Sequence, residues 1–231
     1  MTKTTTQLLL LHGALGNAAQ FDALCGLLLP EHVAFAPNFP GHGGLPTDAP
    51  FSMARFSDYV LRFLEKENIE QTDIFGYSMG GYVALHLAWK HPERVRRIFT
   101  LGTKLDWSPE TATGMSRMFD VEKIEAKVPH FAEMLAKMHT PLDWKEVCQN
   151  TAAFLADLGN GQGLPPEAFS QIACPVTIGL GELDNVVTPE ESRAVAESLP
   201  NGRFEILMGA KHPIEQADTV LLAARLKEFF R

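Results

Sequence analysis

Short apolar runs alternate along the chain with longer stretches whose apolar residues recur every three or four positions. Six runs predict strands, at residues 8–11, 33–36, 74–75, 95–101, 175–181 and 203–208, and the continuous run at residues 8–11 predicts a strand buried on both faces. Helical spacing predicts helices between and after them, at residues 18–29, 53–67, 79–90, 189–199 and 213–230. Strands that alternate with helices form a parallel sheet. We therefore predict an α/β fold with a mainly parallel sheet of about six strands and helices on both faces.

The alternation stops between residues 104 and 170, where no convincing strand is found. Three helical patterns occupy this segment, at residues 113–127, 128–139 and 142–158. The glycines of Gly159–Gly163 end the last pattern, and Pro165-Pro166 prevents it from restarting. We therefore expect residues 1–103 and 171–231 to build one α/β core, with residues 104–170 as a helical insertion.

The composition fits one folded domain and excludes several classes of protein. The chain has 231 residues, of which 45% are hydrophobic, and this is enough for a substantial core. Its net charge is −8 with acids and bases interspersed, and without a basic run we expect no nucleic acid partner. Residues 1–7 are polar, and the apolar run after them is too short for a signal peptide or a membrane span. We expect a cytoplasmic protein.

The sequence offers no pattern for a metal or a cofactor. Cys25, Cys148 and Cys174 are odd in number and lack the spacing of metal ligands, which is typical of reduced thiols. Residues 104–170 contain neither a glycine-rich phosphate loop nor a cluster of cations. We expect a protein that works without metal or cofactor, as a monomer or homodimer.

The motif with the clearest chemistry is Gly76–Gly80, which fits the pattern G-x-S-x-G between a predicted strand and a predicted helix. Strand, sharp turn and helix is the context that this motif requires, because the turn holds the serine in a strained conformation with its hydroxyl clear of the chain. Glycines at both ends leave room for the turn, and the helix directs its positive end at the serine. Ser78 is therefore the candidate nucleophile.

This nucleophile needs a base within hydrogen-bond reach, and the base needs an acid that fixes its tautomer. His212 follows the last predicted strand and Asp184 follows the one before it, so the chain order is Ser, Asp, His. The carboxyl ends of parallel strands meet at one edge of the sheet, where such folds bind ligands. We predict a catalytic triad of Ser78, His212 and Asp184. Asp106, after the fourth strand, is a rival acid, and Glu182 is a weaker one.

Two backbone groups near Ser78 are candidates for an oxyanion hole. The oxyanion that develops during acyl transfer needs two hydrogen-bond donors. The N–H of Met79 is the first after the serine, and the N–H of Ala14 lies in the loop after the first strand, which Gly13 and Gly16 leave bare. We predict Ala14 and Met79 as the two donors.

Five short motifs of the chain, taken together, are specific for one type of fold. They are His12–Gly16, Pro40–Gly43, Gly76–Gly81, Gly181–Asp184 and Gly209–His212, which run from the first strand to the last helix. With them the chain resembles the α/β-hydrolase fold superfamily, and it is most similar to small bacterial carboxylesterases, thioesterases and the menaquinone-pathway lyase. The resemblance implies that residues 104–170 form a small helical cap over the substrate pocket.

Comparison with particular members of the superfamily narrows what the resemblance implies about substrate and sheet, and the loop after the second strand differs as well, with Asn38 where members often carry an acid. The menaquinone-pathway lyase carries an arginine soon after the Gly-Gly of the elbow, where this chain has Tyr82, and this counts against a polyanionic substrate. A haloalkane dehalogenase would need an aspartate at the position of Ser78, so that class is excluded. Members of the superfamily usually open with a β-hairpin, for which residues 1–7 leave no room, so we expect six parallel strands.

Together these features predict a cofactor-free serine hydrolase that cleaves a small-molecule carboxylic ester or thioester through an acyl-enzyme. Ser78 attacks, His212 moves the proton and Asp184 orients His212. Two alternatives stay open: a lyase or C–C bond hydrolase that uses the same triad, and a non-catalytic ligand-binding member of the fold.

Apolar side chains of the loops and of the insertion are candidates for substrate contacts, because such a surface suits an apolar acyl chain. We expect substrate contacts from Leu15, Tyr82, Trp107, Met118 and Met134. The insertion offers further apolar residues at Met115, Phe119, Phe131, Met138 and Trp144. The alternative is that most of these side chains pack within the core of the insertion itself.

Overall fold

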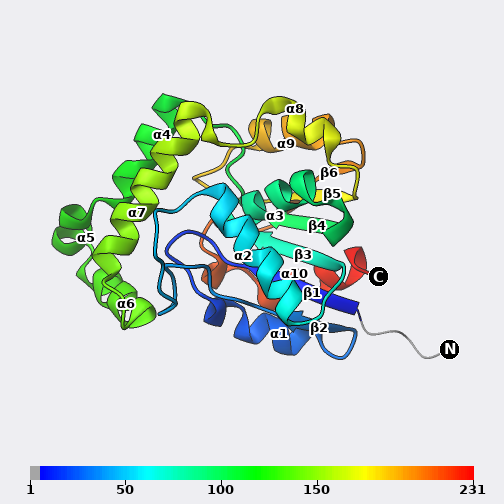
Figure 1. The fold of residues 1–231 in the computed structure, drawn as a ribbon, viewed down its shortest axis with the longest axis horizontal. Coiled ribbons are helices and arrows are strands. Elements are labelled where there is room, and N and C mark those ends of the chain that lie inside the picture. The colour runs from blue at the N-terminus through cyan, green and yellow to red at the C-terminus, as the bar shows by residue number, and fades with distance from the viewer. Residues whose placement is uncertain (1–5) are drawn as a thin grey trace.

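The computed structural model describes residues 6–231, which form an α/β fold around one parallel sheet (Figure 1). Within that range the sheet has six strands in the order β2-β1-β3-β4-β5-β6, and every neighbouring pair is parallel. The strands are β1 (Thr6–Leu11), β2 (His32–Phe35), β3 (Thr72–Tyr77), β4 (Val95–Leu101), β5 (Val176–Gly181) and β6 (Gly202–Leu207). The predicted fold class is confirmed. The first five residues of the polar N-terminal stretch lie outside the described range.

The inner strands β1, β3, β4 and β5 are largely buried because helices cover both faces of the sheet. Leu8 and Leu10 of β1 face one core cluster, whereas Leu9 and Leu11 face another, as expected for side chains that alternate along a strand. On the first face lie α1 (Asp22–Leu28) and α10 (Thr219–Phe229). On the second lie α2 (Met53–Lys66), α3 (Met79–Lys90), α8 (Pro166–Gln171) and α9 (Pro189–Ser198).

The strand order places a crevice at the carboxyl ends of β1 and β3. The chain leaves β1 toward β2 on one side of the sheet, and from β3 onward it proceeds to the other side. Loops that leave two adjacent strands in opposite directions open a crevice between them, and this is where open α/β sheets bind ligands. Ser78, which directly follows β3, stands at this point.

Helices fill the chain between β4 and β5, and all of them except the last, α8, stand to one side of the sheet (Figure 1). They include α4 (Pro109–Ser116), α5 (Val121–Lys127), α6 (Pro129–His139) and α7 (Trp144–Asp157), followed by α8. Within residues 6–231, no helix is long and apolar enough to cross a lipid bilayer. The division of the chain into a core and an insertion stays a prediction.

Several helix boundaries differ from the prediction. Pro165-Pro166 was expected to prevent a helix from restarting, but α8 begins at Pro166, because a proline is tolerated in the first turn of a helix. At two other boundaries an aspartate explains the difference. The helix predicted over residues 113–127 is broken at Asp120, whose carboxylate accepts a backbone N–H of the next turn at 3.1 Å. The closing helix, predicted over residues 213–230, begins at Thr219, because the carboxylate of Asp218 accepts two backbone N–H groups at 3.0 Å. An aspartate that caps a helix in this way sets where the helix starts.

Candidate active site

The turn between β3 and α3 holds Ser78 in a strained conformation. Its φ and ψ are 51° and −118°, a backbone conformation that residues other than glycine rarely adopt. Gly76 and Gly80 make the turn possible: a Cβ at Gly76 would lie 2.4 Å from the Cα of Gly81, and one at Gly80 would lie 2.1 Å from the carbonyl oxygen of Leu11. The N–H of Ser78 donates to the carbonyl of Leu101 at 2.8 Å, so β4 helps to fix the turn.

Hydrogen bonds connect Ser78 to two of the residues that the sequence singled out. The Nε2 atom of His212 lies 3.4 Å from the Oγ atom of Ser78, and its Nδ1 atom lies 2.8 Å from the Oδ2 atom of Asp184. If the carboxylate accepts the proton on Nδ1, the lone pair on Nε2 points to the serine hydroxyl. The serine contact is long for a hydrogen bond, and such contacts tighten when a substrate binds.

Asp184 is held as a carboxylate by its surroundings. Its side chain is only 1% exposed, yet its Oδ1 atom accepts the N–H groups of Val186 and Val187 at 2.8 and 3.0 Å. Burial raises the pKa of this carboxyl, but the hydrogen bond with His212 and the two backbone donors outweigh burial and bring the pKa below its ordinary value. The group is therefore charged at neutral pH.

The structure does not bring the rival acids to His212. Asp106 is exposed and lines a separate surface groove with Thr188 and Glu190. Glu182 is also exposed, and its carboxylate accepts the N–H of Gly209 at 2.8 Å.

Sequence reasoning missed two residues that follow β4 and support this arrangement. Gly102 has a φ of +62°, and a Cβ there would lie 3.0 Å from the Oδ2 atom of Asp184 and 3.2 Å from the Nδ1 atom of His212. The hydroxyl of Thr103 donates to the carbonyl of Ser78 at 3.0 Å. Both lie directly beyond a strand end, at the same edge of the sheet as Ser78, and that position was the available signal.

The loop after β1 lies beside the serine. A Cβ at Gly13 would lie 3.2 Å from the Cβ of Ser78, so the backbone of this loop approaches the nucleophile closely. The N–H groups of Ala14 and Met79 have no hydrogen-bond partner within residues 6–231. Two free donors next to the serine are what an oxyanion hole requires.

Buried histidines hold this loop in place. His12 accepts the N–H of Phe39 with Nε2 at 3.0 Å, and its Nδ1 atom lies 2.8 Å from the carbonyl of Gly13. On α6, His139 accepts the N–H of Gly43 with Nδ1 at 3.1 Å, which leaves the proton on Nε2, 3.2 Å from the carbonyl of Leu15. A helix between β4 and β5 therefore bonds to the loops after β1 and β2 at once.

Because of these histidines, we expect the free energy of unfolding to fall in mild acid. Burial lowers the pKa of His12 to about 4, and burial also lowers the pKa values of His42 and His139. Below about pH 6.5 the unfolded chain binds protons that the folded chain refuses, so stability is full above this pH and falls as the pH drops toward 4. His12 alone should cost about 3 kcal/mol of unfolding free energy by pH 4.

Urea unfolding between pH 7.5 and 4.5 measures this dependence. We expect His139→Gln to give a shallower dependence of unfolding free energy on pH than the wild type. His130→Gln is the matched control on the same helix, because the side chain of His130 is 98% exposed, and it should leave the slope unchanged. Equal slopes for both variants and the wild type would contradict the role given to the buried ring.

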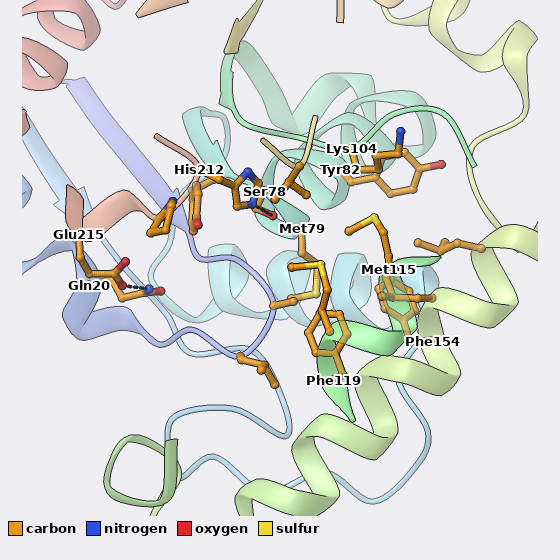
Figure 2. Close-up of a pocket in the computed structure, with 18 of the residues that line it drawn as sticks. Gln20, Ser78, Met79, Tyr82, Lys104, Met115, Phe119, Phe154, His212 and Glu215 are labelled. Atoms are coloured by element: carbon orange, nitrogen blue, oxygen red, sulfur yellow. Dashed lines mark hydrogen bonds between the residues drawn. The ribbon is translucent and has the colours of Figure 1, made fainter. Parts of the chain in front are cut away.

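An apolar cavity of about 260 Å³ opens beside Ser78 (Figure 2). Its lining includes all five residues predicted for substrate contacts, namely Leu15, Tyr82, Trp107, Met118 and Met134. It also includes Met115, Phe119, Phe131, Met138, Phe154, Leu155 and Leu158. Trp144 does not line the cavity and is buried in the core. Seven of the eight apolar positions that residues 104–144 were expected to offer thus face the cavity, and their contact with substrate stays a prediction.

Few charged groups reach this cavity. The lining includes Lys104, which forms an ion pair with Glu191 of α9, and Glu215, which accepts a hydrogen bond from Gln20 (Figure 2). No group of three His, Cys, Asp or Glu side chains within the described part of the chain is arranged to hold a metal ion. The groups available for chemistry are therefore the serine, its two hydrogen-bonded partners and the backbone donors.

Comparisons with known proteins identify the fold and the family. The family model described as alpha/beta hydrolase fold matches residues 6–144. A pimeloyl-[acyl-carrier protein] methyl ester esterase of Neisseria meningitidis is 26% identical over 99% of this chain and 94% of its own. A 2-hydroxymuconate semialdehyde hydrolase of Pseudomonas putida is 28% identical over 88% of this chain and 76% of its own. The structure of a thermophilic esterase from Thermogutta terrifontis superposes with a TM-score of 0.77 at 22% identity, covering 100% of this chain and 91% of that one.

Proposed function

Because the chain belongs to the alpha/beta hydrolase fold family, we propose that it is a serine hydrolase that cleaves a carboxylic ester or thioester through an acyl-enzyme. One observation carries the proposal: hydrogen bonds run from Ser78 through His212 to Asp184 at one end of an apolar cavity. An acyl group that fills this cavity brings its carbonyl carbon to the serine. The likeness to the Neisseria esterase supports the ester as the bond that is cleaved.

In the first half of the proposed reaction, the Oγ atom of Ser78 bonds to the carbonyl carbon while its proton passes to the Nε2 atom of His212. The charge that develops on the carbonyl oxygen is stabilised by the N–H groups of Ala14 and Met79. Asp184 stabilises the imidazolium that forms. The bond to the alcohol or thiol then breaks, and His212 gives its proton to that leaving group.

In the second half, a water molecule attacks the acyl-enzyme, and His212 takes the proton of this water. Collapse of the second tetrahedral intermediate releases the carboxylic acid and returns the proton to Ser78. His212 thus acts as base and then as acid in each half, and this requires that Asp184 hold one tautomer of the ring throughout.

Covalent labelling followed by kinetics tests the proposal. We expect a fluorophosphonate probe to label the protein once per chain, because the probe reacts with an activated serine. We also expect p-nitrophenyl esters and acyl thioesters to be hydrolysed. Ser170→Ala, at an exposed serine on α8, should label and turn over as the wild type does. A protein that neither labels nor hydrolyses any member of the two series would be a non-catalytic binder of the fold.

Hydrolysis of a C–C bond is the second candidate, because the likeness to the Pseudomonas hydrolase extends over 88% of the chain. Attack on a ketone carbonyl would use the same three residues, with the proton delivered to a carbon leaving group. A diketone tested beside the esters separates the two. Fast cleavage of the diketone with slow cleavage of activated esters would favour this candidate over the first.

A further inference from the structure

We propose that the cavity beside Ser78 selects acyl groups that carry no charge, and that Glu191 enforces this choice by holding the ammonium group of Lys104 out of the cavity. This inference rests on the proposed ester or thioester hydrolysis and names its substrate class. The Lys, Arg, Asp and Glu side chains of the described lining are Lys104 and Glu215. Whether the cavity accepts a charged acyl group therefore depends on whether Lys104 or Glu215 can bind that charge.

Lys104 contributes its aliphatic stem to the cavity, but its charge is already matched. Its Nζ atom pairs with the Oε2 atom of Glu191, and the two side chains are 13% and 8% exposed. The other carboxylate oxygen of Glu191 accepts the N–H of Leu105 at 3.1 Å, which fixes the carboxylate in place. Figure 2 shows the ammonium end of Lys104 pointing away from Ser78 and Met79. Long cationic side chains commonly bury the stem in this way and direct the head elsewhere.

Turning Lys104 toward a ligand would break this ion pair. Glu191 would then remain as a buried carboxylate without its cation, which is the costly outcome when one partner of a buried pair is removed. A carboxylate on the acyl chain therefore cannot bind Lys104 without leaving Glu191 buried and unpaired.

Glu215 opposes anions as well. Its side chain is exposed and bonds to Gln20 at the edge of the cavity (Figure 2). An acyl chain with a terminal carboxylate would pass this negative charge and then lie among mainly apolar side chains. The methionines and phenylalanines offer it no hydrogen bond, and Tyr82 and Trp107 are neutral donors that bring no positive charge to match it. A neutral chain of the same length meets neither obstacle.

Two esters that differ only in this charge test the inference. p-Nitrophenyl hexanoate and p-nitrophenyl hydrogen adipate have the same six-carbon chain, and their rates are normalised to hydrolysis by hydroxide. For the wild type we expect kcat/KM to favour the hexanoate by about 100-fold or more, because the buried carboxylate finds no available cation. Rates for the two esters within about threefold of each other would overturn the inference.

Glu191→Gln tests the mechanism of the choice. The glutamine can still accept the N–H of Leu105, but it leaves the charge of Lys104 unmatched. We expect the ratio of adipate to hexanoate kcat/KM to rise about tenfold. The rise should come from a lower KM for the adipate. Glu190→Gln, at the exposed neighbour on the same helix, is the matched control and should leave the ratio unchanged.

The readout separates charge selection from a merely structural pair. If Glu191→Gln lowered both rates alike and left the ratio unchanged, the pair would serve only stability and the inference would be wrong. If neither ester were hydrolysed and no fluorophosphonate label formed, the proposed function itself would be overturned, and the substrate class named here with it.

Discussion

Ser78→Ala is expected to lower kcat/KM by about 10⁴-fold or more while the protein stays folded. The side chain of Ser78 makes its hydrogen bond with His212, whereas the turn depends on the backbone and on its glycines. Alanine loses the nucleophile but adds no steric demand at this φ. The fluorophosphonate label should disappear with the activity, and the melting temperature should change little.

Ser170→Ala is the control, because it also replaces one serine by alanine and is prepared in the same way, but at an exposed position. Turnover by Ser78→Ala within tenfold of the wild type would exclude Ser78 as the nucleophile. A variant that failed to fold would be recognised by its far-UV circular dichroism spectrum, and Ser78→Cys would then report on the same site, because a thiol keeps a nucleophile at this position.

Asp184→Asn is expected to lower kcat/KM by roughly 10³- to 10⁴-fold. The Oδ1 atom of Asp184 accepts two backbone N–H groups, so the carbonyl oxygen of an asparagine would take this place. Its amide NH₂ would then face the Nδ1 atom of His212, which must accept, and the proton moves to Nε2. A ring with its proton on Nε2 cannot take the proton of Ser78.

Asp106→Asn is the matched control, because Asp106 is exposed and lies outside the cavity. Its kcat/KM should stay within about threefold of the wild type. A large loss for Asp106→Asn together with a small loss for Asp184→Asn would reverse the assignment of the acid and contradict the hydrogen bonds seen around His212.

The parts of the molecule that follow from local patterns were predictable from the sequence. The run Leu8–Leu11 indicates a strand buried on both faces, and the glycine-framed Ser78 indicates the elbow at the end of β3. Asp184 could be chosen over Asp106 because the residues around it frame a turn just beyond a strand. In each case a few neighbouring residues carry the information.

The remaining features depend on residues that are distant along the chain, and no local pattern reports them. Lys104 and Glu191 are separated by 87 positions, and only the fold, which brings the loop after β4 to α9, makes them a pair. Gly102 stands out once Asp184 and His212 are seen against it. Helix ends were missed for a different reason, because the caps at Asp120 and Asp218 lie inside stretches whose apolar spacing continues.

The position of His139 limits how this chain can exchange parts with its relatives. Recombination that replaced residues 104–170 as a block would remove the only α6 ring that reaches both the carbonyl of Leu15 and the N–H of Gly43 in the described structure. Leu15 directly follows Ala14, whose N–H is a candidate oxyanion donor. A chimera without a histidine at position 139 would therefore change the cavity wall and loosen this donor in the same step. Single substitutions on the cavity wall that spare His139 leave both of its hydrogen bonds in place, and they should therefore disturb the loop at Ala14 less than exchange of the helices does.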